Sequence, residues 1–202
     1  MLIEIWNKKL KESINDLIRG YQSSSKSILT EGDLENLLFF YCKTKKLPVH
    51  SQITWFKSDR KSGYEVDLTI IDEEKLLVEE FDEINKLYYN FEYPHKGYFY
   101  DGEIIGIEIK FIRKGLGLKS KVLCDLKKLK ERLIPHKKQN ISNGIYKISN
   151  LENIKFHVII GFKQISLLNT AKKHIEEYLS LNYEFNNLLE ITLFCPTKIE
   201  KL

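Results

Sequence analysis

Two segments that alternate between apolar and charged residues constrain the fold of this chain more than any other feature. The first is YEVDLTII, residues 64–71, and the second is IIGIEIKFI, residues 104–112. Alternation with a period of two is typical of β-strands, whose successive side chains point to opposite faces. Glu108 and Lys110 therefore share one face of the second strand, and Asp67 lies on the polar face of the first. Because isoleucine dominates the second segment, we expect an interior strand rather than an edge strand.

The rest of the chain alternates between helical and extended patterns. Apolar residues at helical spacing predict helices over residues 2–18, 30–46, 73–89, 120–133 and 166–180. Short apolar or aromatic runs predict further strands over residues 52–57, 157–162 and 189–194. The Asp-Gly pair in YFYDGEII, residues 98–105, predicts a hairpin between extended flanks.

These elements predict an α/β protein with a mixed central sheet that is flanked by helices. A length of 202 residues is consistent with one domain over 1–202. We expect residues 1–29 to form an N-terminal helix and a Ser-rich connector. We expect residues 72–103 to form an insertion, a helix followed by a hairpin, between the two alternating strands.

Composition narrows the class of protein. Hydrophobic residues make up 43% and charged residues 30%, which argues against disorder. No apolar run approaches the roughly 20 residues of a membrane span, and the charged start MLIEIWNKKL does not resemble a signal peptide. The cysteines Cys42, Cys124 and Cys195 lie far apart and form neither a zinc signature nor a disulfide framework. We therefore expect a cytoplasmic protein.

The net charge of +4 hides a strong asymmetry along the chain. Residues 72–103 contain ten acidic and three basic residues, a balance of −7, whereas residues 110–140 contain eleven basic and two acidic residues, a balance of +9. The basic stretch is either a phosphate-binding surface or the solvated face of a helix. If it binds phosphate, the candidate contacts are Lys114, Lys119, Lys121 and Lys128.

Asp67, Glu108 and Lys110 are the residues that point to chemistry. Two carboxylates on adjacent strands make a hard-oxygen site for Mg²⁺, and a neighbouring lysine can orient a water molecule for attack on a phosphodiester. An acidic-x-Lys pattern alone is also common on exposed sheet faces. Charges on an interior strand are less readily explained that way, because they cost free energy unless they are paired or bind an ion.

In its order of elements and in the motifs YEVDLTI and IGIEIKF, the chain resembles the PD-(D/E)xK nuclease superfamily, which has a restriction-endonuclease-like fold. Val66 stands where the family name has proline. The resemblance implies that Asp67 and Glu108 bind Mg²⁺, with Mn²⁺ as a substitute, and that Lys110 orients the attacking water. It also implies a role in the metal site for Glu35, on the helix of residues 30–46.

The implied activity is that of a Mg²⁺-dependent deoxyribonuclease that leaves 5′-phosphate and 3′-hydroxyl ends. The implied partner is double-stranded DNA, and a homodimer is the simplest arrangement for cutting both strands. Restriction, phage defence, repair and recombination remain open. One alternative is a catalytically inactive module of the same fold that binds nucleic acid or a protein, and another is a phosphodiesterase that acts on a nucleotide.

Overall fold

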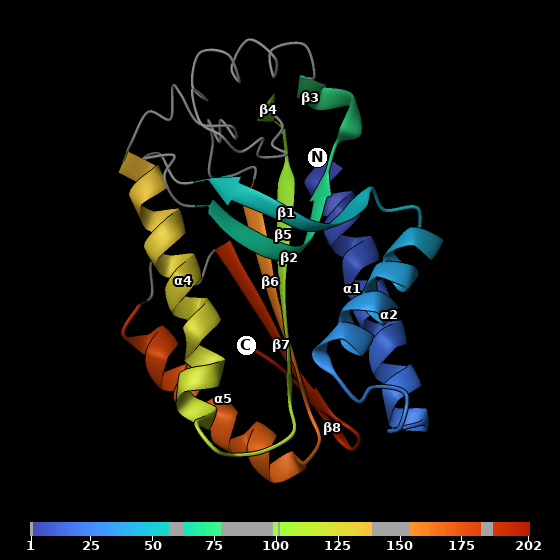
Figure 1. Cartoon of the computed structure of the whole chain (residues 1–202), viewed down its shortest axis with the longest axis vertical. Coiled ribbons are helices and arrows are strands. Elements are labelled where there is room, and N and C mark those ends of the chain that lie inside the picture. The colour runs from blue at the N-terminus through green and yellow to red at the C-terminus, as the bar shows by residue number, and fades with distance from the viewer. Residues whose placement is uncertain (1, 57–62, 78–98, 101, 139–153, 183–187) are drawn as a thin grey trace, which may run out of the picture.

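The computed structural model describes residues 2–56, 63–77, 99–100, 102–138, 154–182 and 188–202 and places one large sheet between two layers of helices (Figure 1). The six strands of this sheet, in spatial order, are β1 (Val49–Phe56), β2 (Gly63–Ile71), β5 (Ile104–Ile112), β6 (Ile154–Phe162), β7 (Leu189–Cys195) and β8 (Lys198–Lys201). Helices α1 (Leu2–Ser23) and α2 (Glu31–Thr44) cover one face, and α4 (Leu118–Lys138) and α5 (Ile165–Ser180) cover the other. The predicted α/β class, with a mixed sheet flanked by helices, is confirmed.

The sheet changes direction at β5. Strands β1, β2 and β5 pair antiparallel, β5, β6 and β7 pair parallel, and β8 pairs antiparallel with β7. Parallel neighbours require crossover connections, and α4 and α5 lie in the connections from β5 to β6 and from β6 to β7. Strand β5 is thus an interior strand, as its isoleucines predict.

The sheet has an apolar core on each of its two faces. Ile105, Ile107 and Ile109 pack into the core under α1 and α2, whereas Ile104 and Ile112 pack into the core under α4 and α5. Alternation along β5 therefore directs Glu108 and Lys110 toward the α4 side of the sheet. The predicted division of β5 into two faces is confirmed.

The helices on the α1 side have clear end signals. Thr30 caps α2 with a complete capping box: its hydroxyl accepts from Asp33 N–H at 3.1 Å, and the Asp33 carboxylate accepts from Thr30 N–H at 2.8 Å. Helix α1 extends past its predicted end to Ser23. Tyr21 explains this extra turn, since its buried ring lies edge-on to Phe111 and Phe194.

The described parts of the insertion are extended at Phe99–Tyr100, as predicted, but differ from the prediction at residues 73–77 and in how the strands pair. Residues Glu73–Lys75 form a short 3-10 helix, and β3 (Leu76–Leu77) pairs with β4 (Phe99–Tyr100) in a small second sheet. The predicted helix is therefore wrong over 73–77, and its part from 78 to 89 lies outside the described residues. The predicted hairpin is also wrong, because Tyr100 pairs with Leu76 rather than with β5.

A buried polar network ties α1 to the sheet. His157 on β6 is almost fully buried, and its Nε2 lies 2.7 Å from Oδ1 of Asn7. Asn7 Nδ2 donates to Glu190 Oε1 at 3.1 Å, and Lys11 Nζ lies 2.8 Å from Glu190 Oε2. Burial lowers the pKa of His157 to about 4, so the imidazole is neutral at physiological pH.

Gly161 on β6 is a site of close approach. A methyl group at this position would lie 2.7 Å from Cδ2 of Phe111 and 3.0 Å from Cζ of Phe194. The bare backbone thus allows the Phe111 ring, next to Lys110 in the chain, to pack close against β6.

Within the part of the chain that the structure describes, none of the helices combines the length and the apolar character needed to cross a membrane.

Candidate active site

Strand β2 separates from β5 at Asp67. The ladder between them runs from Ile71↔Ile104 to Leu68↔Ile107 and stops there, although the same register would set Asp67 opposite Glu108. The Asp67 carboxylate takes the place of the missing backbone partner, and its Oδ2 accepts a hydrogen bond of 2.7 Å from Ile109 N–H. Directly opposite residues of antiparallel strands point to the same face. The ladder ends one residue short of the pair that would set Asp67 opposite Glu108, so the meeting of these two carboxylates stays a prediction.

A second carboxylate accepts a hydrogen bond from the β5 backbone two residues further along the strand. Glu31 Oε2, in the first turn of α2, accepts from Phe111 N–H at 3.3 Å. Two successive outward N–H groups of β5 are thus satisfied by acidic side chains instead of by strand β2. We call the opening between β2 and β5 beyond Leu68, bordered by Asp67 and Glu31, the fork.

Strand β1, which pairs with the other edge of β2, is distorted opposite Asp67. Gln52 of β1 would pair with Asp67, but the ladder skips this pair, and Gln52 has φ 55°, in the left-handed region. Val66 packs into one core while Leu68, two residues on, packs into the other, which indicates a sharp twist of β2. A left-handed non-glycine residue inside a strand is strained, and such strain is concentrated at functional sites.

Negative charge accumulates at the fork. Burial raises the pKa of Asp67 to about 6; the Ile109 N–H bond opposes this rise, and the carboxylates of Glu35 and Glu31 add to it. Lys110 lowers the pKa of Asp67 only in part. A carboxylate with a raised pKa next to further carboxylates is a site at which a bound cation would be stabilising.

Lys110 is held by acidic residues from two different helices. Its Nζ lies 3.3 Å from Oδ2 of Asp125 on α4 and 3.5 Å from Oε2 of Glu31. Burial disfavours the charged form of Lys110, but Asp125 and Glu31 more than offset it, so the pKa of Lys110 lies above its usual value. The side chain is therefore a fixed positive charge and not a proton acceptor at neutral pH.

Glu108 is buried in the centre of the sheet, with only 5% of its surface exposed. It precedes Lys110 by two residues, so both side chains leave the strand on the same side. Burial of a carboxylate at an interior strand position is expensive unless charge or hydrogen bonds compensate it. Its role in the site stays a prediction from the sequence.

Sequence reasoning missed Glu31 as a site residue, and it gave Asp125 only as one of the polar residues that the resemblance places near the site on the helix after the signature. Glu31 directly follows the helix cap at Thr30, so it resembled an ordinary acidic residue of a first helical turn. Asp125 interrupts the basic stretch, and its Oδ1 also lies 3.4 Å from Lys128 Nζ. In the sequence, the available signal was an acidic residue within a lysine-rich helix, and the structure leaves only 8% of this side chain exposed.

A basic cleft adjoins Lys110. It has a volume of about 840 Å³ and lies between β5, the start of α4 and the end of β6. Its basic lining residues are Lys110, Arg113, Lys114, Lys121, Lys128 and Lys163. Three of the four predicted phosphate contacts thus border the candidate site, and the fourth, Lys119, lines the neighbouring groove between α4 and α5.

The carboxylate oxygens near the fork suit a hard cation that takes few of its ligands from the protein. Across the described residues, no group of three or more His, Cys, Asp or Glu side chains is arranged so that together they could hold a metal ion. Mg²⁺ is commonly held by one or two carboxylates, with water and substrate oxygens completing its octahedron. Asp67 and Glu108 are the residues that would hold such an ion, and Glu35 adds negative charge beside it.

Comparisons of this chain with protein-family models, with curated proteins and with solved structures found no match.

Proposed function

We propose that this chain is a metal-dependent nuclease with a restriction-endonuclease-like fold, which hydrolyses phosphodiester bonds of nucleic acid. The observation that carries the proposal is the fork, where the Asp67 carboxylate accepts a hydrogen bond from the β5 backbone one residue beyond Glu108 and Lys110 lies at the edge of a basic cleft. The order of elements also supports it: α2, the antiparallel strands β1, β2 and β5, then α4 and the parallel strand β6. This is the order that the resemblance implies.

The proposed reaction assigns each side chain one task. Mg²⁺ bound to Asp67 and Glu108 would supply Lewis acidity and stabilise charge on the scissile phosphate. Lys110, kept charged by Asp125 and Glu31, donates a hydrogen bond that orients the attacking water. The water oxygen bonds to phosphorus and releases a proton to solvent, the bond from phosphorus to the 3′ oxygen breaks, and the 3′ oxygen takes up a proton from solvent. Lysines of the basic cleft hold the flanking phosphates.

Cleavage assays with matched variants test this proposal. Purified full-length protein is incubated with duplex DNA, single-stranded DNA and RNA, with Mg²⁺ or Mn²⁺ and with chelator. We expect cation-dependent cleavage that falls by about 10³-fold or more in Asp67→Ala and in Lys110→Met. Lys172→Met is the control, because Lys172 pairs with Glu200 on β8, away from the fork.

Two results would contradict the assignment. Cleavage that persists in both site variants would show that the activity comes from elsewhere or from a contaminant. Binding of nucleic acid without cleavage under every cation condition would instead support the inactive module of the same fold.

A further inference from the structure

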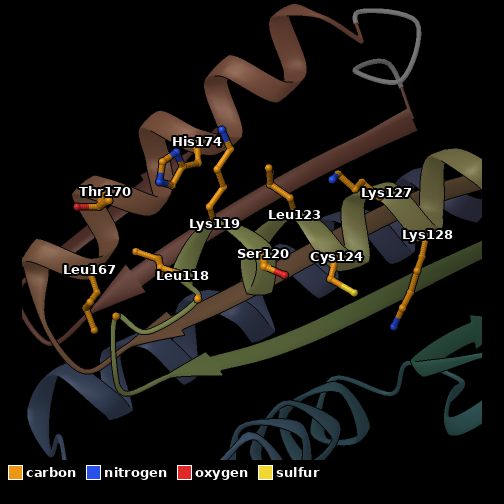
Figure 2. A pocket seen from close by; sticks show the side chains of 12 residues that line it. Leu118, Lys119, Ser120, Leu123, Cys124, Lys127, Lys128, Leu167, Thr170 and His174 are labelled. Atoms are coloured by element: carbon orange, nitrogen blue, oxygen red, sulfur yellow. The ribbon is translucent and has the colours of Figure 1, made fainter.

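A second groove lies next to the basic cleft. This α4–α5 groove has a volume of about 1000 Å³ and runs between the first half of α4 and the face of α5 (Figure 2). Ser120, Cys124 and Lys128 line both depressions. In Figure 2 Lys128 extends away from α5, while Lys119 extends toward His174 on α5. A chain-like ligand that occupies the basic cleft can therefore continue over α4 into the groove.

The groove combines an apolar floor with a basic rim. Its apolar lining residues are Leu118, Leu123 and Leu167, and its basic lining residues are Lys119, Lys127, Lys128 and His174. Of the described residues that line it, none is acidic. Lys119 lies 3.7 Å from Glu177, but both side chains are more than half exposed, and such surface pairs are weak. Its charge therefore remains available to an anion.

This combination fits an unpaired nucleic-acid strand better than a duplex. An unpaired nucleotide offers an apolar base face together with an anionic phosphate, so it can use both the leucine floor and the lysine rim. A duplex buries its base faces in the stack and presents phosphates, so the floor would add nothing to its binding. Gly117, at the end of the groove, adds no side chain, and nothing lies within 4 Å of where its Cβ would be.

We infer that the α4–α5 groove binds unpaired nucleotides of the strand that passes through the basic cleft, so that the substrate is single-stranded nucleic acid or a duplex with a single-stranded tail. This inference rests on the proposed function, which is the reason to expect a nucleic-acid strand in the basic cleft. Its recognition chemistry is that of the groove itself: bases against leucines, and phosphates against Lys119, Lys127 and Lys128.

Equilibrium binding in chelator, where no cleavage is expected, tests the groove separately from catalysis. Fluorescence anisotropy compares a labelled single strand of about 20 nucleotides with a blunt duplex of the same sequence. The variant is Lys119→Gln with Lys127→Gln. The matched control is Lys8→Gln with Lys26→Gln, which removes the same charge from exposed positions of α1 and of the connector after it.

We expect the groove variant to weaken single-strand binding by roughly tenfold and duplex binding by less than about threefold, with the control changing either by less than about twofold. An equal loss for both substrates, or no loss for either, would overturn the inference. Competition by polyglutamate as effective as that by the oligonucleotide would also overturn it, in favour of an acidic protein partner.

Cys124, which lines both the groove and the basic cleft, provides a second readout when the native sequence is compared with the groove variant. It is the exposed one of the three cysteines, whereas Cys42 and Cys195 are buried and serve as unreactive internal references. We expect the single-stranded oligonucleotide to slow iodoacetamide alkylation of Cys124 severalfold in the native sequence but not in the groove variant. Alkylation that is unaffected by saturating oligonucleotide would refute the groove assignment. Protection of Cys124 without any cleavage would refute the proposed function and leave the groove assignment intact.

Discussion

Replacing Asp67 with asparagine is expected to stabilise the fold while it abolishes the proposed activity. Burial, with added repulsion from Glu35 and Glu31, raises the pKa of Asp67 from 3.8 to about 6, so the neutral-pH carboxylate is disfavoured in the folded state. This difference corresponds to roughly 3 kcal/mol at 1.36 kcal/mol per pKa unit. Because the side chain is only partly buried, solvent screening reduces the expected gain to about 1–2 kcal/mol. Asparagine retains an oxygen that can accept the Ile109 N–H bond.

The pH dependence gives the sign of this effect. Because the folded-state pKa of Asp67 lies above the unfolded-state value, its destabilising contribution is absent below about pH 3.8, grows up to about pH 6 and is constant above that. Urea unfolding should therefore show Asp67→Asn to be more stable than the native sequence at about pH 7.5, and the difference should vanish near pH 4. A variant that is less stable at neutral pH would refute the reasoning.

A control and a ligand test sharpen this measurement. Asp33→Asn should lose stability at neutral pH, because hydrogen bonds from the N–H groups of Leu29 and Thr30 lower the pKa of Asp33. Mg²⁺ at about tenfold its dissociation constant should stabilise the native sequence by about 1.4 kcal/mol and leave Asp67→Asn unchanged. Equal stabilisation of both proteins would place the cation elsewhere.

Three further predictions concern neighbouring features. Gly161→Ala should lower the free energy of unfolding by about 1–3 kcal/mol in urea titrations, since the new methyl group meets the Phe111 ring at 2.7 Å; unchanged stability would contradict this packing. Since burial lowers the pKa of His157 from 6.5 to about 4, roughly 3 kcal/mol of stability should be lost as the pH falls from 6.5 to 4, and a His157→Gln variant should lack this loss. Asp125→Asn should lower the pKa of Lys110, moving the alkaline limb of the cleavage profile to lower pH; a profile that only scales down would contradict this role.

The central strand and its faces could be predicted from the sequence because the period-two signal in β5 is strong. Residues 104–112 form the predicted strand, and the two isoleucine faces enter separate cores. Helix α2 was also predictable, since its cap at Thr30 has a local chemical signature. Local periodicity and capping chemistry thus account for the elements on which the candidate site is built.

Features that depend on distant partners were not predictable. The strand Leu76–Leu77 exists through its pairing with Phe99–Tyr100, which overrode the helical spacing at the described start of the predicted helix, residues 73–77. The strand β8, with the sequence KIEK, is too short and too charged to signal an edge strand. Glu31 enters the site only because the start of α2 meets β5 in three dimensions, a contact across 80 residues of sequence.

The hydrogen bonds at the fork limit which substitutions relatives of this chain can accept at Asp67 and Glu31. Asp67 and Glu31 close an edge in the interior of the sheet, where two N–H groups of β5 would otherwise face no acceptor. A relative that has lost catalysis would still need an acceptor at each position, so asparagine, serine or glutamine should replace these acids more readily than alanine or leucine. In relatives that have lost activity, we therefore expect both positions to lose their negative charge but to remain polar.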